Sequence, residues 1–337
     1  MKHILITGGA GFIGSTLADR ALSDGYKVTA IDNFDPFYDK SIKQNNFALA
    51  LGNPNYSFIE ESMSNTDAVC AKLAGNIDII VHLAAKAGVR YSISHPIDYT
   101  ETNVNGTVKV CELARRLNVG KIIFSSSSSV YGNNPHTPWS ENLELMPQSP
   151  YAQTKALSEK YLKDFSEESN IDVLVFRFFS VYGPRMRPDL MMSRMANCIF
   201  SGERLKIFGD GSASRDYTFV DDIVESVMRG IETDCGKHEV LNVGSGNPIS
   251  LKELISIFES ITGKKLLCEH VERIKEESSA TWAESSRLQK VLGYRPSMRI
   301  EEGVKMFIEW YKKEQLTMNN ALNGHAEFIS ASATISI

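Results

Sequence analysis

A chain of 337 residues, with 42% hydrophobic and 23% charged residues, has the composition of an ordinary soluble globular protein of about two domains. Its 36 Lys and Arg residues against 41 Asp and Glu residues give a net charge of −5, without the basic concentration that nucleic acids or anionic membranes require. No apolar run is long enough to span a bilayer, and neither the cysteines nor the histidines have metal-ligand spacing, so we expect a cytoplasmic protein without a metal site or a disulfide framework.

Short apolar runs alternate with helical patterns through the first half of the chain. The runs expected to form strands cover residues 2–7, 27–32, 56–60, 77–83, 121–125 and 171–179. Strands that alternate with helices in this way predict an α/β fold with a doubly wound parallel sheet of the Rossmann type. A further strand is expected at 239–243, after a helical segment that follows Asp221, so a late part of the chain should complete the sheet.

The character of the sequence changes near residue 181, where a stretch rich in Pro, Arg and Met begins. A helix is expected at 190–200, a short strand at 205–208, and another helix after Ser250, which forms a capping box with Glu253. We therefore predict a main domain of residues 1–180, completed by about 218–247; a smaller α/β lobe of residues 181–217 and 248–314 for the substrate; and a tail of residues 315–337. The tail consists of small and polar residues, which is typical of disorder.

A glycine-rich turn joins the first expected strand to the first expected helix. Gly8, Gly11 and Gly14 are spaced three residues apart, which lets the backbone approach a pyrophosphate and lets the helix pack closely on the strand. Asp32 ends the second strand and no Arg or Lys follows it until Lys40, so NAD, with its free 2′-hydroxyl, is favoured over NADP. The residues expected to contact NAD are Gly8, Gly11, Phe12, Ile13, Gly14, Asp32, Asn33, Ala84, Ala85 and Lys86. The last three follow a buried strand, where simple packing of the strand end is the alternative.

Tyr151 and Lys155 lie four residues apart near the start of an expected helix, so their side chains share one face. A phenol with an ordinary pKa of about 10 is a poor base at neutral pH, but a neighbouring ammonium and an oxidised nicotinamide both favour its phenolate. Ser127 follows a strand that ends at the same edge of the sheet, and its hydroxyl can bond to the oxygen that Tyr151 deprotonates. We therefore predict that these three residues act on a sugar hydroxyl, with a solvated helix face and a serine-rich loop as the alternatives.

Together with Arg177 to Pro184 downstream, these motifs resemble the extended short-chain dehydrogenase/reductase family of nucleotide-sugar epimerases and dehydratases, over Lys2 to about Tyr311. Three segments are most similar to those of the UDP-glucuronate 4-epimerases: Ala87–Ser92, Ser126–Gly132 and Gly183–Asp189. The resemblance implies bound NAD and the interconversion of UDP-glucuronate and UDP-galacturonate. The reaction it implies passes through a transient 4-keto sugar, with the hydride returned from NADH.

The resemblance also assigns roles to the catalytic and cofactor residues. It implies that Tyr151 and Ser127 hold the sugar C4 oxygen. It implies that Lys155 and Asn103 contact the nicotinamide ribose. In the family, dimers form through the helix that carries the catalytic tyrosine and the helix around the asparagine, so a homodimer is expected.

For the substrate, the resemblance matches Arg215 to a contact with the nucleotide diphosphate and places Phe208 in the segment that lines the nucleobase. Arg90 and Arg185 are candidates for the uronate carboxylate or the diphosphate, because a guanidinium can bind either one bidentately. Surface salt bridges are the alternative for both arginines. The expected substrate-binding residues are Arg90, Ser127, Ser128, Ser129, Ser180, Arg185, Phe208 and Arg215.

Two serines argue against neighbouring reactions of the family. Ser128 and Ser129 stand where the 4,6-dehydratases carry an Asp-Glu pair, and Ser129 stands where the uronate decarboxylases carry Glu. Water elimination needs an acid and a base, so dehydration is disfavoured, and decarboxylation is disfavoured with it. A UDP-glucose or UDP-N-acetylglucosamine 4-epimerase and a catalytically idle NAD-binding protein remain open alternatives. The chain departs from the family pattern at Ser62, near the expected adenine, and at Glu276–Ser279 in the smaller lobe.

Overall fold

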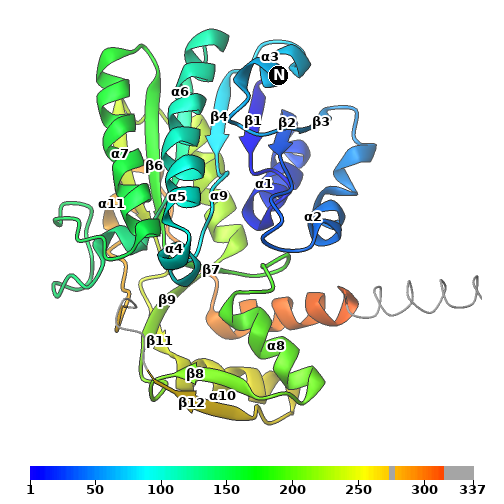
Figure 1. The fold of residues 1–337 in the computed structure, drawn as a ribbon, viewed down its shortest axis with the longest axis vertical. Helices are drawn as coiled ribbons and strands as arrows, with labels where there is room; N and C mark the ends of the chain where they lie inside the picture. The colour runs from blue at the N-terminus through cyan, green and yellow to red at the C-terminus, as the bar shows by residue number, and fades with distance from the viewer. Residues whose placement is uncertain (273–277, 315–337) are drawn as a thin grey trace, which may run out of the picture.

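The computed structural model describes residues 1–272 and 278–314 (Figure 1). Within these ranges the main sheet has seven parallel strands in the order β10-β6-β5-β4-β1-β2-β3. They are β1 (His3–Thr7), β2 (Lys27–Asp32), β3 (Tyr56–Glu60), β4 (Ile79–His82), β5 (Lys121–Ser127), β6 (Asp172–Phe178) and β10 (His238–Val243). The strand order reverses between β1 and β4, as in a Rossmann fold, so the predicted fold class is confirmed and β10 is the late strand.

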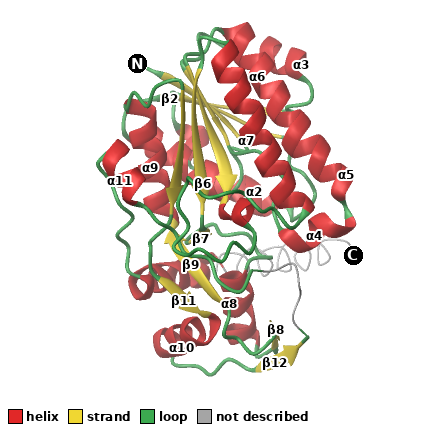
Figure 2. Ribbon diagram, turned by 90° about the vertical axis from the view of Figure 1, so that its left-hand side faces the viewer, coloured by secondary structure: helices red, strands yellow, loops and turns green. Residues whose placement is uncertain are grey.

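Helices cover both faces of this sheet, as Figure 2 shows with the strands in yellow between red helices. Successive side chains of a strand point to opposite faces: Ile4 and Ile6 pack into one core, and Leu5 packs into the other. The helices that cover the sheet on the side of the first core are α1 (Phe12–Ser23), α9 (Val220–Glu232) and α11 (Ser286–Leu292). Those on the side of the second core are α3 (Thr66–Lys72), α6 (Gly106–Leu117) and α7 (Pro150–Glu168).

Short elements follow the carboxyl ends of several strands. They are α2 (Lys40–Phe47), α4 (Val89–Ser94) and α5 (Pro96–Tyr99), the 3₁₀ turns η1 (Ala50–Gly52) and η3 (Ser128–Tyr131), and the π-helical turn η2 (Thr100–Asn105). The loops beside them form the edge of the sheet where open α/β folds bind their ligands.

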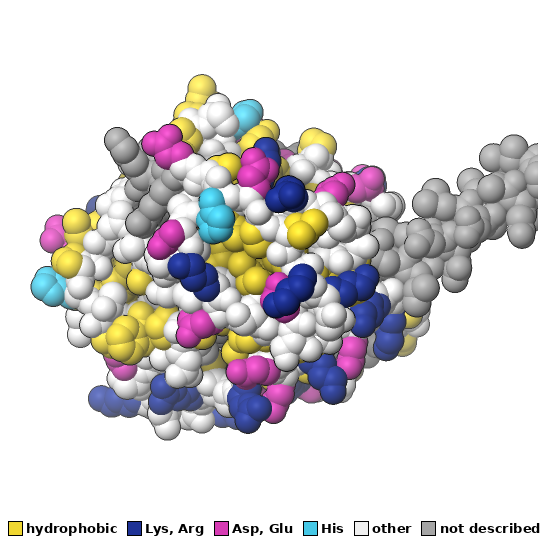
Figure 3. All heavy atoms as spheres, turned by 90° about the horizontal axis from the view of Figure 1, so that it is seen from below, with side chains coloured by type: hydrophobic (Ala, Val, Ile, Leu, Met, Phe, Trp, Pro, Cys, Tyr) yellow, Lys and Arg dark blue, Asp and Glu magenta, His cyan; other side chains and the backbone are white. Residues whose placement is uncertain are grey.

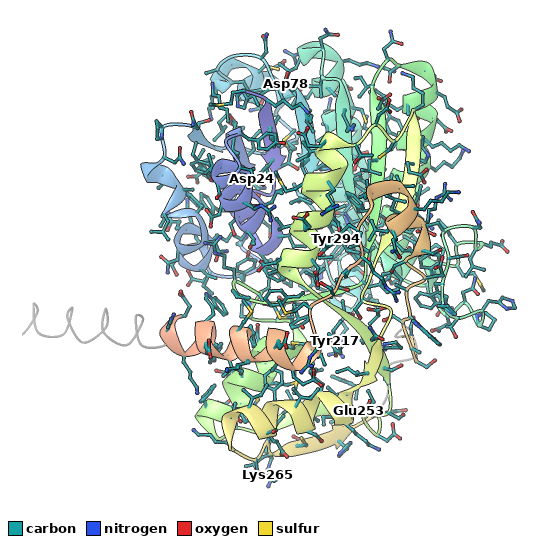
Figure 4. The ribbon with its side chains drawn as sticks, turned by 180° about the vertical axis from the view of Figure 1, so that it is seen from behind. Asp24, Asp78, Tyr217, Glu253, Lys265 and Tyr294 are labelled. Carbon is teal, nitrogen blue, oxygen red and sulfur yellow. The ribbon has the colours of Figure 1, made fainter. Side chains whose placement is uncertain are left out.

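A smaller lobe lies below this edge in Figure 1. It contains β7 (Ser180–Tyr182), β8 (Leu205–Phe208), β9 (Ser214–Phe219), β11 (Pro248–Ser250), β12 (Cys268–Val271), α8 (Met191–Ser201), α10 (Leu251–Thr262) and a helix over 300–314. In the described part of the lobe, β11-β9-β7 and β12-β8 form two small sheets. The predicted capping box of Ser250 and Glu253 is present at the start of α10, where Figure 4 labels Glu253.

The two parts share one continuous core. Phe258 of α10 and Phe307 of the last helix belong to the same buried cluster as Leu17 of α1. The helix α11 packs against β10 and α9 of the main sheet, although it falls within the second segment expected for the lobe. This packing does not test the predicted domain boundaries, which stay a prediction. The predicted tail lies outside the described residues.

No helix in the described ranges combines the length and the hydropathy that a bilayer crossing requires. Figure 3 views the molecule from below, onto the end formed by the smaller lobe, and shows basic and acidic side chains interspersed over that face.

Candidate functional site

A cavity with a volume of about 1330 Å³ lies where the main sheet meets the smaller lobe. Its walls come from the loops that follow β1, β2, β4, β5 and β6, and from β8 and β9 of the lobe. Tyr217 on β9, labelled in Figure 4, belongs to the wall on the lobe side. The cavity thus occupies the edge of the sheet where the sequence predicts the ligands to bind.

The glycine-rich turn forms the floor of the cavity below β1. Gly8 has a φ of 72°, and a Cβ atom on it would lie 2.8 Å from the backbone nitrogen of Ala84. A Cβ atom on Gly14 would lie 2.2 Å from the carbonyl oxygen of Gly8, so the turn packs on α1 only with glycine there. Gly11 is the N-cap of α1 and offers no side-chain cap, which leaves the helix N-terminus suited to a diphosphate. The expected contacts Phe12 and Ile13 line the same cavity.

Asp32 lies at the end of β2 with its carboxylate held by the backbone N–H groups of Ala10, at 3.3 Å, and Phe34, at 2.8 Å. Burial raises the pKa of Asp32, and the charge of Lys43 opposes this increase. Lys43 lies on α2, with its Nζ 4.0 Å from Asp32 Oδ1. This ion pair was not expected from the sequence, because the two residues are eleven positions apart. Both residues line the cavity, as do Asn33 and Ser62, so a hydroxyl-bearing ribose fits beside this carboxylate.

The loop after β4 carries the expected contacts Ala84, Ala85 and Lys86, and all three line the cavity. Asn103 accepts a hydrogen bond from the N–H of Lys86 at 2.8 Å and donates one to its carbonyl oxygen at 3.0 Å. Asn103 is buried behind this loop, and its amide also donates to Thr154 Oγ1 at 3.0 Å. The structure therefore gives Asn103 the task of holding the Lys86 backbone, and its contact with a ribose stays a prediction.

Tyr151 and Ser127 are brought together as predicted. Tyr151 sits in the first turn of α7, which Ser149 caps by accepting the N–H of Ala152 at 3.2 Å. Burial raises the pKa of Tyr151, whereas its hydrogen bond with Ser127 and the charge of Arg187 lower it. Arg187 was not among the residues expected to act on Tyr151, and the effect of the Lys155 ammonium on the phenolate stays a prediction.

Lys155 is directed to the backbone of β5, because its Nζ donates to the carbonyl oxygen of Ser125 at 2.7 Å. Burial lowers the pKa of Lys155 to about 7, while the charge of Glu159 acts in the opposite direction. The lysine still lines the cavity one helical turn from Tyr151, in reach of a ligand along that face.

The remaining serines gather around the catalytic pair. Ser129 donates from its backbone N–H, at 3.2 Å, and from its hydroxyl, at 2.9 Å, to Ser127 Oγ. Ser128 and Ser180 line the cavity with them. This part of the cavity is therefore built from hydroxyl groups that suit the oxygens of a sugar.

On the lobe side, the expected residues Arg90, Phe208 and Arg215 line the cavity. The guanidinium carbon of Arg90 lies 3.9 Å from the ring centroid of Phe208, a cation–π contact between two residues that are 118 positions apart. This pair joins α4 of the main domain to β8 of the lobe.

Arg185 is not among the residues that line the cavity, and its contact with a substrate stays a prediction. Its guanidinium turns away from the cavity and donates to Asp19 on α1 at 2.7 Å. The backbone here is unusual, because Arg185 has a φ of 67° and Gly183 a φ of 140°. The structure thus places Arg185 in a salt bridge, which is the alternative that its sequence pattern left open.

Arg187 takes the place in the cavity that was expected for Arg185. It donates to both carboxylate oxygens of Asp189, at 2.9 and 2.7 Å, and to the carbonyl oxygen of Ala87 at 3.4 Å. Its guanidinium carbon lies 5.2 Å from the ring centroid of Phe37. The only signal in the sequence was its presence in the Gly183–Asp189 segment, since spacing does not show which arginine turns inward.

Comparisons with known proteins agree with this geometry. The family model described as "NAD dependent epimerase/dehydratase family" matches residues 4–244. A UDP-glucuronate 4-epimerase of Thermodesulfobacterium geofontis is 36% identical over 317 residues, which cover 93% of this chain and 97% of the relative. A UDP-glucuronic acid 4-epimerase from Bacillus cereus, solved with UDP-glucuronic acid and NAD, is 32% identical with a TM-score of 0.86 and covers 92% of this chain and 99% of its own. A UDP-N-acetylglucosamine 4-epimerase from Methanobrevibacter ruminantium is 30% identical with a TM-score of 0.85, over 93% of this chain and 99% of its own.

Proposed function

Because the chain belongs to the NAD-dependent epimerase/dehydratase family, we propose that it is a UDP-sugar 4-epimerase that interconverts UDP-glucuronate and UDP-galacturonate. The observation that carries this proposal is the pairing of Tyr151 with Ser127 in a cavity that also holds Arg187. A base for a sugar hydroxyl thus lies beside a guanidinium that can attract a carboxylate.

Tyr151 takes the proton of the sugar C4 hydroxyl, and Ser127 holds the same oxygen through its own hydroxyl. NAD held along the glycine-rich turn would supply the acceptor for the C4 hydride and the donor that restores it, after the sugar has turned its other face to the cofactor. Tyr151 then gives its proton back to the C4 oxygen, so the residue ends the cycle in its starting state. The net reaction inverts C4 and consumes no oxidant.

The residues beside the catalytic pair favour epimerisation over elimination. Dehydration would need a proton donor and a proton acceptor at C5 and C6, whereas positions 128 and 129 offer only serine hydroxyls. Hydroxyl groups of Ser128, Ser129 and Ser180 instead suit hydrogen bonds to the oxygens of a uronate.

A second candidate substrate is a neutral or N-acetylated hexose. Arg187 already forms a bidentate pair with Asp189, which neutralises part of its charge before any substrate binds. With this pair kept in the complex, Arg187 favours a uronate over a neutral hexose less strongly. UDP-glucose or UDP-N-acetylglucosamine is then the substrate.

Proton NMR of the anomeric signals tests the proposal. The purified protein is incubated separately with UDP-glucuronate, UDP-glucose and UDP-N-acetylglucosamine, without added NAD. We expect UDP-galacturonate to form from UDP-glucuronate. Turnover of a neutral sugar alone would overturn the uronate assignment, and no turnover of any of them, even with NAD added, would overturn the epimerase.

We also propose that the chain forms a homodimer through α7 and the helical segment around Asn103, which begins with α5 and continues through η2. Leu157 and Tyr161 of α7 lie on one helical face with 55% and 37% of their surface exposed, and α5, which packs on α7, exposes Ile97 at 75%. Sedimentation velocity at micromolar concentration should give a dimer that Leu157→Glu converts to a monomer. A monomeric unmodified protein would contradict this interface.

A further inference from the structure

An ion pair connects two loops across the cavity. Lys86, after β4, lies with its Nζ 2.7 Å from Oδ2 of Asp35, in the loop after β2. Their side chains are 19% and 30% exposed, and both residues line the cavity. Lys86 was expected from the sequence to contact NAD, but nothing in the spacing connected it with Asp35.

The strand order shows what this pair crosses. β1 lies between β2 and β4 in the sheet, so its carboxyl end and the glycine-rich turn lie between the two loops. Neighbouring strands are about 4.8 Å apart, which separates β2 from β4 by roughly twice that distance. The Lys86–Asp35 pair therefore spans the turn on which a dinucleotide diphosphate rests.

Both ends of the pair are held in place. The Lys86 backbone is fixed by two hydrogen bonds with the buried Asn103. Asp35 accepts the N–H of Phe37 at 3.0 Å through its other carboxylate oxygen, and its carbonyl oxygen accepts from Lys43 at 2.8 Å. A contact that is fixed on both sides resists opening more than two flexible surface side chains do.

We propose that the Lys86–Asp35 pair is a latch over the cofactor, which opens for NAD to enter or leave and otherwise keeps it bound. The latch rests on the proposed function, because an epimerase recovers its cofactor in the starting state after each turnover and works without exchanging it. Lys86 and Asp35 are positioning residues here, since they act by closing the loop over the turn.

The test measures how fast bound NAD leaves the holoenzyme. Protein purified with radiolabelled NAD is mixed with excess unlabelled NAD, and the label that stays with the protein is followed by rapid gel filtration. We expect Asp35→Asn and Lys86→Met each to accelerate release by about three- to tenfold. The double variant should release NAD at the same rate as either single variant, because each change already breaks the pair.

Lys40→Met is the matched control. Lys40 forms an ion pair with Glu60 at 2.6 Å on the same flank of the sheet, but that pair joins the start of α2 to the end of β3 and does not cross the turn. Its loss should leave NAD release unchanged. The thermal midpoint of each apoprotein checks that the variants fold as the unmodified chain does.

Two results would overturn the latch. If Lys86→Met accelerates release while Asp35→Asn does not, Lys86 holds the cofactor directly. If the double variant multiplies the effects of the single variants, the two residues act independently. Because release is measured without any sugar, the latch and the proposed epimerase activity can fail separately.

Discussion

Tyr151 carries the proton transfer at C4, so its hydroxyl is the atom on which turnover depends most. Tyr151→Phe removes that oxygen and keeps the ring that packs edge-on against Tyr99 at 6.2 Å between centroids. We expect epimerase turnover to fall by about a hundred- to ten-thousandfold, the usual contribution of a general acid–base, while bound NAD is retained. NMR measures turnover, and absorbance of the denatured extract measures NAD.

Tyr161→Phe, on the same helix, is the matched control and should retain full turnover because its side chain is partly exposed away from the cavity. An active Tyr151→Phe variant would show that another group takes the proton.

Arg187 contributes, after burial and the hydrogen bond with Ser127, to the pH at which Tyr151 ionises. Its charge lowers the pKa of Tyr151, so Arg187→Met raises that pKa. Since the phenolate is the active base, the rising limb of the kcat–pH profile should move to higher pH. For every pH unit that the limb moves, the phenolate fraction at neutral pH, and kcat with it, falls about tenfold.

Arg185→Met is the control for this prediction. It removes the same charge at a position two residues before Arg187, from a side chain that pairs with Asp19. Its profile should match that of the unmodified protein. Equal profiles for both variants would mean that Arg187 acts on substrate binding alone.

At the scale of the elements, a buried network ties α7 to the end of β5. Ser126 of β5 donates to Glu159 of α7, which also binds the guanidinium of Arg177 on β6 at 2.7 Å. Ser126 lies between Ser125, whose carbonyl oxygen accepts a hydrogen bond from Lys155, and the catalytic Ser127. The network therefore holds the two elements of the catalytic group in register.

Glu159→Gln leaves the Arg177 charge uncompensated in a site where both side chains are less than a tenth exposed. We expect the free energy of unfolding to fall by about 3–5 kcal/mol, as measured by urea denaturation. Lys160→Met removes the exposed pair with Asp164 from the same helix and should change stability by less than about 1 kcal/mol. Equal effects of the two variants would show that the buried pair contributes no more than a surface pair.

For the whole molecule, acid stability should depend on His82, which lies buried at the end of β4 between the hydroxyls of Thr7 and Thr107. Burial, with a smaller effect from the charge of Lys155, lowers the pKa of His82 to about 3, whereas an unfolded histidine titrates near 6.5. Between these two values the unfolded chain binds a proton that the native protein does not bind. Stability is therefore fully present above pH 6.5 and falls as the pH decreases, by up to about 1.4 kcal/mol per pH unit.

Urea denaturation at pH 7.5, 6.0 and 5.0 measures this dependence. His82→Gln should reduce its slope, even though the variant starts from a lower stability. His136→Gln, which changes an exposed histidine, should keep the slope of the unmodified protein. Parallel slopes for all three proteins would rule out His82 as the source of the acid sensitivity.

The sequence by itself determined the features that depend on local pattern. The alternation of apolar runs predicted the strands and the Rossmann sheet, because each strand and helix has its own periodicity of buried residues. The spacing of Gly8, Gly11 and Gly14 and of Tyr151 and Lys155 identified two walls of the cavity, since positions so close in sequence have a nearly fixed geometry. Strand ends were less accurate, and β5 extends two residues beyond its expected end to Ser127.

Only the tertiary structure decided which charged groups face one another. Lys43 reaches Asp32 because α2 folds back over the end of β2, and Lys86 meets Asp35 across β1, which lies between their strands. Arg187 lines the cavity whereas Arg185 pairs with Asp19 on α1, which spacing alone does not reveal. These contacts join residues that are distant in sequence, so they depend on strand order and on the path of the loops, whereas local pattern depends on neither.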